Sequence, residues 1–334
     1  MPSLALDVRS LARPHSSFAR VVRLIQAGAA AVELPLESWE GGSCSSDLLW
    51  TPHADLPPVE PGPRLIVTLH DINPLLGGGR RLFARMRHAG RFRRKVRQVM
   101  QEAWRINTGS DDAATRLQDA FPGLPQPWVT PWFASAEFRP AEPGEDVASA
   151  VAAHGLEPGF LLYLGALRPH KNWRLVLEAY AALAPSLRQR HPLVMVGRRH
   201  RAGAEADRLA AKLGIGGELR WLEALPDEDL PWLYRAAAGF LFPSLAEGFG
   251  LPPLEAQACG TPVLAARATS LPEVLGDGAL LLDPHDASAW TAAMAHLLSA
   301  PEAATDLARA GLANAGRFHA RRLGEAIVRM VEAP

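Results

Sequence analysis

Short apolar runs alternate with longer segments of helical periodicity throughout the second half of this chain. Strands are predicted at 160–167, 192–197, 218–222, 239–243, 263–266 and 279–282. Helices are predicted at 173–187, 203–213, 227–237 and 252–259, with two more beginning at Ala287 and Ala303. Each return from a helix to a new strand requires a crossover connection. The alternation therefore predicts a mostly parallel sheet with helices on both faces.

The first half shows a weaker version of the same pattern. Strands are predicted at 4–8, 30–34, 48–51 and 65–69, and helices at 18–26, 80–103 and 112–120. The Pro-rich stretch 51–63 is a loop within this half, whereas the polar segment 140–146 (PAEPGED) is the better domain boundary. We therefore expect an α/β protein with two Rossmann-like domains, at 1–142 and 150–316, whose strand ends face a cleft.

Composition excludes several other classes. With 334 residues, 48% hydrophobic and 21% charged, the chain suits two globular domains and not a disordered or fibrous protein. Equal numbers of cationic and anionic residues, 35 each, give no global attraction to nucleic acid. Two cysteines are too few for a disulfide framework. The first residues lack a signal-peptide pattern, and no run of about 18 apolar residues occurs, so we expect a reduced, cytoplasmic protein.

The most informative segment runs from Pro243 to Pro262 (PSLAEGFGLPPLEAQACGTP). A strand ends at its start, two glycines allow the backbone to approach a ligand, and a proline suits the first turn of the next helix. Free N–H groups at that helix start can bind an anion or sugar hydroxyls. Glu247 and Glu255, eight residues apart, can hold the hydroxyls of one extended polar ligand. The alternative is an ordinary loop with one helix-capping glutamate.

This segment resembles the E-x7-E signature of retaining nucleotide-sugar glycosyltransferases of family 4 (glycosyl transferases group 1), which have the GT-B architecture. Further matches are YLGALRPHKN at 163–172, DEDLPWLYRAA at 227–237, SLPEVLGD at 270–277 with DP at 283–284, LALDVRSL at 4–11 and VTLHD at 67–71. The resemblance covers nearly the whole chain and is strongest from 156 to 285. The first-half matches fit a subgroup of mannosyl- and rhamnosyltransferases.

The resemblance implies roles for the residues of the signature. Glu255 would bind the ribose hydroxyls of the nucleotide, and Glu247 would contact hydroxyls of the donor sugar. Backbone N–H groups around Gly248, Phe249, Gly250 and Leu251 would hold the sugar and the distal phosphate.

The same resemblance extends the site to the loop after the strand at 160–167. Lys171 would neutralise the diphosphate leaving group, and Gly165 and Gly197 would line the nucleotide-sugar site. His170 stands where the family has an arginine, and an ordinary imidazole titrates near pH 6.5, so it is not a permanent cation. Arg168, two residues earlier, is a candidate for the missing charge.

Two features of the first half bear on the donor sugar and the acceptor. His70 matches the family's histidine near the donor-sugar carbon, with Asp71 ordering its loop. The first strand–helix loop, His15–Arg20 (HSSFAR), departs from the family's glycine-rich sequence, although Ser16 and Ser17 can cap the helix. This departure leaves open a loss of activity.

The segment Arg80–Arg97 carries nine cations and no acid. Its apolar residues make a basic amphipathic helix feasible. Two interpretations stay open: a solvated helical face, or contact with anionic headgroups or a lipid-linked diphosphate acceptor on the inner face of the membrane. Nucleic acid is disfavoured because no aromatic stacking platform accompanies the charges.

The resemblance thus implies an enzyme: a retaining hexosyltransferase that uses a nucleotide diphosphate sugar and a saccharide or lipid-linked saccharide acceptor in surface polysaccharide or glycoconjugate synthesis. Neither a cofactor nor a metal is expected, with cations neutralising the phosphates instead. GDP-mannose is favoured as the donor, followed by dTDP-rhamnose or a UDP-sugar. A C-terminal helix at 317–334 would cross back to the first domain, as it does in the family.

Three alternatives to this function exist. A nicotinamide-dependent dehydrogenase requires a G-x-G-x-x-G after its first strand, which neither half has. An inactive GT-B partner protein and a nucleotide-sugar epimerase of the same architecture stay open.

Overall fold

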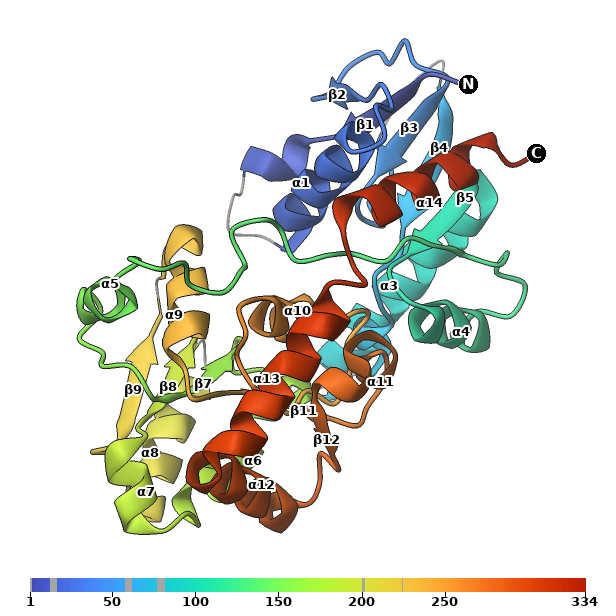
Figure 1. The fold of residues 1–334 in the computed structure, drawn as a ribbon. Coiled ribbons are helices and arrows are strands. Elements are labelled where there is room, and N and C mark those ends of the chain that lie inside the picture. The colour runs from blue at the N-terminus through green and yellow to red at the C-terminus, as the bar shows by residue number, and fades with distance from the viewer. Residues whose placement is uncertain (1, 13–16, 58–61, 77–81, 200–201, 224) are drawn as a thin grey trace. The chain divides into compact units, whose positions relative to one another are not determined.

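The computed structural model describes residues 2–12, 17–57, 62–76, 82–199, 202–223 and 225–334 (Figure 1). The chain forms two compact units. Unit 1 comprises Met1–Ser135 together with Phe318–Pro334, and unit 2 comprises Ala136–Arg317. Each unit contains a six-stranded sheet in which neighbouring strands pair in parallel.

The sheet of unit 1 has the strand order β2-β1-β3-β4-β5-β6. Its strands are β1 (Leu4–Asp7), β2 (Glu37–Trp39), β3 (Leu48–Thr51), β4 (Arg64–Thr68), β5 (Ala103–Thr108) and β6 (Trp128–Val129). Its helices are η1 (Arg9–Ala12), α1 (Ser17–Ala30), α2 (Asn73–Leu76), α3 (Leu82–Glu102), α4 (Asp111–Ala120) and α14 (Ala320–Glu332).

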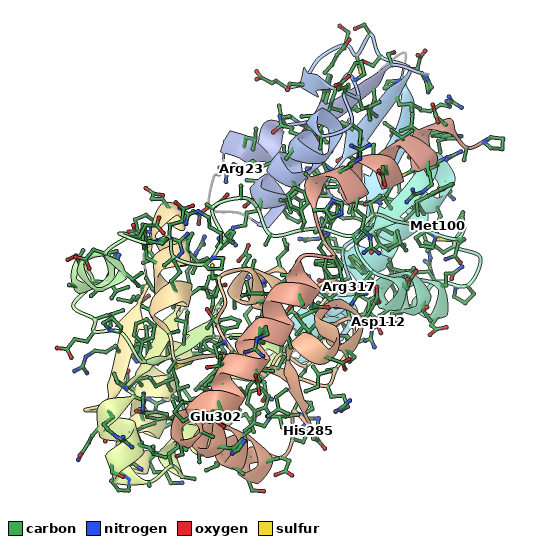
Figure 2. The ribbon with its side chains drawn as sticks, in the orientation of Figure 1. Arg23, Met100, Asp112, His285, Glu302 and Arg317 are labelled. Atoms are coloured by element: carbon green, nitrogen blue, oxygen red, sulfur yellow. The ribbon has the colours of Figure 1, made fainter. Side chains whose placement is uncertain are left out.

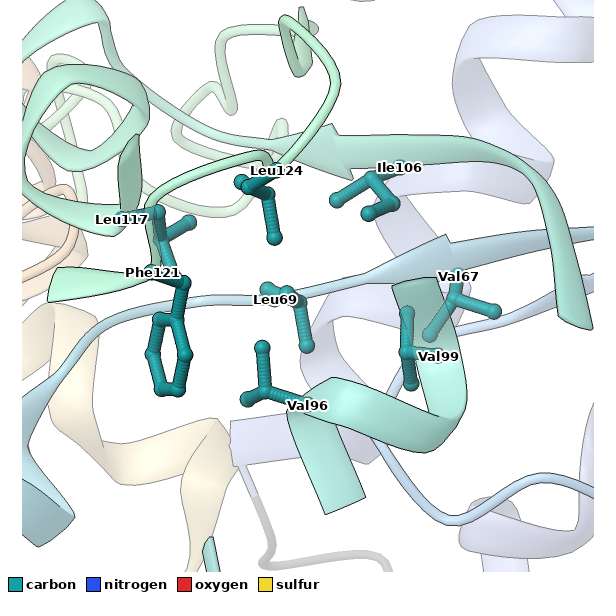
Figure 3. Packing of buried hydrophobic residues seen from close by; sticks show 8 residues of the cluster. All are labelled: Val67, Leu69, Val96, Val99, Ile106, Leu117, Phe121 and Leu124. Carbon is teal, nitrogen blue, oxygen red and sulfur yellow. The ribbon is translucent and has the colours of Figure 1, made fainter. Parts of the chain in front are cut away.

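One apolar core of unit 1 lies between the sheet, α3 and α4 (Figure 3). It consists of Val67, Leu69, Val96, Val99, Ile106, Leu117, Phe121 and Leu124, each at most 7% exposed. Complete burial of one such side chain contributes about 1.5–3 kcal/mol. This packing fixes β4, and therefore the loop that follows it.

On the far side of the same sheet, α1 packs against α14 (Figure 1). Glycines make this contact close: a Cβ added to Gly324 would lie 2.2 Å from the carbonyl oxygen of Gly28. Arg105, on β5, donates to the carbonyl oxygens of Met330, Ala333 and Pro334. The C-terminal helix is therefore an integral part of unit 1.

The sheet of unit 2 has the strand order β12-β11-β10-β7-β8-β9. Its strands are β7 (Leu161–Leu164), β8 (Leu193–Val196), β9 (Leu219–Leu222), β10 (Gly239–Phe242), β11 (Val263–Ala266) and β12 (Leu280–Leu282). Its helices are α5 (Val147–Ala152), η2 (Pro169–Lys171), α6 (Trp173–Ala181), α7 (Pro185–Arg190), α8 (Gly203–Leu213), η4 (Asp227–Asp229), α9 (Leu230–Ala236), α10 (Leu251–Ala258), α11 (Leu271–Leu275), η5 (Gly276–Gly278), α12 (Ala287–Ser299) and α13 (Pro301–Ala315).

Residues 136–146 lie within unit 2 and are tied to α9. The ring of Phe138 lies 5.9 Å from that of Tyr234, and the guanidinium of Arg235 donates to the carbonyl oxygens of Glu137 and Arg139. At the other end of this unit, Arg317 follows α13 and donates to Asn314 Oδ1 over 2.9 Å (Figure 2).

Two sequence expectations about elements are wrong. The predicted strand at 30–34 is instead the last residue of α1 and the turn that follows it: Glu33 adopts a left-handed φ of 54°, and the N–H of Leu34 bonds back to the carbonyl of Ala29 over 2.9 Å, which closes the helix. The predicted helix 173–187 is two helices, α6 and α7, because Pro185 cannot continue the first and disfavours helical geometry at Ala184.

Other expectations fall partly on residues outside the described ranges. Of the loop at 15–20, His15 and Ser16 are not described, and neither are Arg80 and Arg81 of the basic segment. Within the described residues, no helix is both long enough and apolar enough to cross a membrane.

Candidate active site

The strand order of unit 2 determines where a site can form. From β7 the chain proceeds outward to β8 and β9, and then returns to place β10 on the other side of β7. Ligands of open parallel sheets bind at such a switch point, outside the carboxyl ends of the two strands. Lys171 follows β7 and Glu247 follows β10. Two residues that the sequence analysis selected therefore lie at the switch point.

These two residues are in direct contact. Lys171 Nζ lies 2.5 Å from Glu247 Oε1, and Ser244 Oγ donates to the same oxygen over 2.5 Å. The ammonium group also lies 5.2 Å from the centre of the Phe242 ring. The side chains of the pair are 20% and 13% exposed, so the charges are largely shielded but still reachable. An ion pair of this kind can exchange its partner for a ligand that offers complementary charge.

The turn that carries Lys171 is bonded to the strand end that carries Ser244. The carbonyl oxygen of His170 accepts from the N–H of Leu245 over 2.7 Å and lies 3.2 Å from Ser244 Oγ. Burial, followed by the positive charge of Lys171, lowers the pKa of the His170 imidazole. His170 is therefore neutral at neutral pH.

With His170 neutral, the cations of this loop are Lys171 and Arg168. Arg168 precedes the turn η2, and its side chain is exposed. Its charge also contributes to the lowered pKa of His170, though less than burial and Lys171 do.

Gly165 and Gly197 directly follow β7 and β8 and allow close backbone approach beside this loop. Gly197 has a φ of 134°, and a Cβ there would lie 2.6 Å from the carbonyl oxygen of Gly165. A Cβ on Gly165 would lie 3.1 Å from the Tyr163 hydroxyl and 3.7 Å from Lys171 Cδ. A larger residue at either position would therefore displace the strand ends beside Lys171.

The loop between β10 and α10 carries Gly248, Phe249 and Gly250. Gly250 has a φ of 104°, and a Cβ there would lie 2.7 Å from Leu271 Cδ2, so only glycine fits. Leu251 is the first residue of α10, a helix of eight residues. Glu247, in contact with Lys171, directly precedes Gly248 in this loop.

Glu255 lies within α10 and is 3% exposed. The hydroxyl of Tyr234, on α9, lies 3.4 Å from Glu255 Oε2.

His70 belongs to unit 1, in the loop after β4. Its Nε2 donates to the carbonyl oxygen of Pro52 over 2.7 Å, and its ring lies 5.4 Å from that of Phe18. Burial lowers the pKa of this imidazole, with a smaller contribution from the neighbouring His53. The Nε2 bond leaves Nδ1 as the acceptor of the neutral ring.

Sequence reasoning missed Ser244, Thr269 and Ser270. Ser244 contacts Glu247 Oε1, Thr269 Oγ1 accepts from the Glu247 N–H, and Ser270 Oγ lies near the carbonyl oxygens of Glu247 and Phe249. All three residues follow a strand end, β10 or β11, and this position is the signal that could have identified them. Among the described residues, no group of His, Cys, Asp or Glu side chains is arranged to hold a metal ion.

Solved structures with the same architecture define the class of fold. The chain matches Anabaena Alr3699/HepE in complex with UDP and glucose, with a TM-score of 0.76, 16% identity and coverage of 100% of both chains. It matches WaaG, a glycosyltransferase involved in lipopolysaccharide biosynthesis, with a TM-score of 0.73, 18% identity and coverage of 99% of this chain and 100% of the other. The fold is therefore GT-B.

Sequence comparison identifies the family within that class. The profile described as Glycosyl transferases group 1 matches residues 146–313, so the chain belongs to this family of glycosyltransferases. The O-antigen chain mannosyltransferase B of Escherichia coli is 36% identical over 76% of this chain and 66% of its own length. A D-inositol 3-phosphate glycosyltransferase of Saccharomonospora viridis is 37% identical over 69% of this chain and 56% of its own length. This chain thus spans less than two thirds of either relative.

Proposed function

We propose that this chain is a retaining, metal-independent hexosyltransferase of family 4. It transfers mannose, or alternatively rhamnose, from a nucleotide diphosphate sugar to a saccharide or lipid-linked saccharide acceptor in surface polysaccharide or glycoconjugate synthesis. The observation that carries the proposal is the contact of Lys171 and Glu247 at the switch point of unit 2. The mannosyltransferase name of the O-antigen relative favours mannose, with GDP-mannose as the donor. The alternative donors are dTDP-rhamnose and a UDP-sugar.

In this mechanism the bond between the anomeric carbon and the distal phosphate breaks, and a bond to the acceptor oxygen forms on the same face. The acceptor proton passes to the departing phosphate oxygen. Lys171 and Arg168 neutralise the growing phosphate charge, which is the role a metal ion has in other transferases. Glu247 holds sugar hydroxyls once Lys171 has turned to the phosphate, and Glu255 holds the ribose. His70 contacts the donor sugar, and no cofactor takes part.

The proposal is tested in two stages. Thermal shifts with GDP, UDP and dTDP identify the base, because a ligand that binds only the folded state raises its apparent stability. The matching labelled nucleotide sugars are then incubated with the protein, with and without a chelator. We expect slow hydrolysis or transfer that the chelator does not abolish. Neither binding nor turnover would indicate an inactive partner protein, and interconversion of sugars without release of nucleotide would indicate an epimerase.

We further propose that α3 brings the enzyme to an anionic membrane surface. Its exposed side chains include Arg87, Arg91, Arg93, Arg94 and Arg97. Val96 and Phe92 pack into the core of unit 1, so they are not free to insert into lipid as a basic amphipathic helix would. The attraction is therefore electrostatic, at about 1 kcal/mol for each cation near the surface.

Vesicle binding tests this part of the proposal. We expect salt-sensitive retention on vesicles that contain anionic lipid and none on neutral vesicles. Replacing Arg93 and Arg94 by Gln should weaken retention, whereas replacing Arg309 and Arg321, exposed on other helices, should not. Equal retention on both kinds of vesicle would contradict the proposal.

A further inference from the structure

We propose that Thr269 and Ser270 are positioning residues that set the conformation of the donor loop, here defined as residues 247–250. The inference rests on the proposed function, in which this loop holds the sugar and the distal phosphate. The two residues lie between β11 and α11, in the loop that follows the next strand of the sheet after β10.

Both hydroxyls bond to the backbone of the donor loop. Thr269 Oγ1 accepts from the N–H of Glu247 over 3.0 Å. Ser270 Oγ lies 2.9 Å from the carbonyl oxygen of Phe249 and 3.2 Å from that of Glu247, and its proton is shared between them. Ser270 is fully buried, so these contacts are shielded from water. The side chain of the next residue, Leu271, fills the space beside Gly250.

These bonds orient the peptide groups that would meet the donor. In a trans peptide the C=O and the following N–H point in opposite directions. With the carbonyls of Glu247 and Phe249 turned toward Ser270, the N–H groups of Gly248 and Gly250 face the opposite side. The N–H of Glu247 itself is engaged by Thr269. Thr269 and Ser270 therefore fix the orientation of the peptide groups of the donor loop.

The backbone of Thr269 supports a functional reason for this residue. Its φ is 48°, in the left-handed region, where a β-branched side chain is an outlier. Such a conformation costs about 1–3 kcal/mol, and strained residues cluster at functional sites. Glycine would relieve the strain but would remove the hydroxyl that holds Glu247. Replacing Thr269 by glycine should therefore relieve backbone strain, which favours the folded state, but should weaken donor binding because the hydroxyl is lost.

Three variants separate the effect of backbone strain on stability from the effect of the hydroxyl groups on donor binding. Thr269→Gly should melt at the same temperature as the parent or higher, yet its KM for the nucleotide sugar that the thermal-shift and turnover assays select should rise about 3- to 10-fold, the equivalent of one hydrogen bond. Thr269→Ser retains the hydroxyl and should keep KM within about twofold. Ser270→Ala leaves two carbonyls without their donor and should raise KM about 10-fold.

A readout independent of catalysis completes the test. Amide exchange at Glu247 should accelerate in Thr269→Gly and stay unchanged in Thr269→Ser. The control is Glu33→Gly, which relieves a φ of 54° in unit 1 and should leave both KM and Glu247 exchange unchanged. A Thr269→Gly protein with parental KM and parental exchange at Glu247 would overturn the inference. Failure of the proposed function gives a different result, because the parent protein itself would then not turn over a nucleotide sugar. In that case amide exchange at Glu247 alone would test whether Thr269 holds the donor loop.

Discussion

Both sheets have a switch point, and both switch points carry an ion pair, but the two pairs are built differently. In unit 2 the partners Lys171 and Glu247 come from two loops, 76 residues apart. In unit 1, where β1 lies between β2 and β3, Asp7 and Arg9 are two residues apart. Arg9 Nε and Nη2 donate to the two oxygens of Asp7 over 2.9 and 2.7 Å.

The difference decides which pair is available to a ligand. Asp7 has no exposed surface, and its second oxygen also lies 3.8 Å from His53 Nε2. That carboxylate is therefore committed to the protein. The members of the Lys171–Glu247 pair are both partly exposed and belong to separate loops, so each can turn to a substrate without breaking its own loop. Similar positions in two similar sheets thus hold a fully buried carboxylate in unit 1 and a partly exposed ion pair in unit 2.

The largest expected effect is on turnover when Lys171 is replaced. Lys171→Met should lower kcat about 100- to 1,000-fold, because removing one group that stabilises transition-state charge costs about 3–4 kcal/mol. Lys95→Met is the matched control, since Lys95 pairs with Asp55 on unit 1. Steady-state transfer assays compare the two. Equal rates for the Lys171 and Lys95 variants would contradict a role of the unit 2 ion pair in turnover.

A smaller effect is expected at Glu255. Glu255→Gln should weaken nucleotide binding about tenfold, because a neutral amide accepts weaker hydrogen bonds from ribose hydroxyls than a carboxylate does. Titration calorimetry with the nucleoside diphosphate measures this change. Glu325→Gln, an exposed carboxylate on α14, serves as the control. Unchanged affinity in the Glu255 variant would contradict the ribose assignment.

Replacing Asp7 should change stability and not chemistry. Asp7→Asn loses charge-assisted bonds to Arg9, and because Arg9 is 37% exposed the loss is only about 1–2 kcal/mol of unfolding free energy. Urea unfolding measures this loss, and nucleotide affinity should stay at the parental value. If the Asp7 variant unfolded like the parent but lost activity, Asp7 would serve the reaction and not the stability of unit 1, contrary to this prediction.

The smallest expected effect is a pH dependence that the two units share. Burial lowers the pKa of both His70 and His170 in the folded protein. The unfolded chain therefore binds protons first, and stability should fall as the pH drops below about 6.5. Each of His70→Gln and His170→Gln should flatten the decline between about pH 7.5 and about pH 5.5, measured by urea unfolding. An unaltered decline in both variants would exclude these histidines as its source.

Sequence reasoning predicted the order of strands and helices in unit 2 well. Strand–helix alternation, and the Gly and Pro residues that end these elements, are local properties of the sequence. It failed where long-range packing decides. The segment 80–97 has the same periodicity whether its apolar side faces lipid or protein, and only the fold shows that Val96 joins the core. The strand β6, of two residues, is defined by its pairing with β5 and has no pattern of its own.

The candidate site divides in the same way. The motif and the rule of strand ends selected Lys171 and Glu247, which do meet. They did not reveal Ser244 or Thr269, because a single hydroxyl after a strand carries no sequence pattern. Nor did they show that Glu255 would face Tyr234 on a neighbouring helix.

The contact of α14 with α1 bears on how the chain acquires its fold during synthesis. Residues 318–334 are translated after all of unit 2, yet they cover a face of the sheet that begins with β1. Domains generally fold as units in the order in which they emerge from the ribosome. Here that order is inverted, because all of unit 2 can fold while unit 1 still lacks the helix α14. The face of the unit 1 sheet that α14 covers therefore stays uncovered until residues 318–334 have been synthesised.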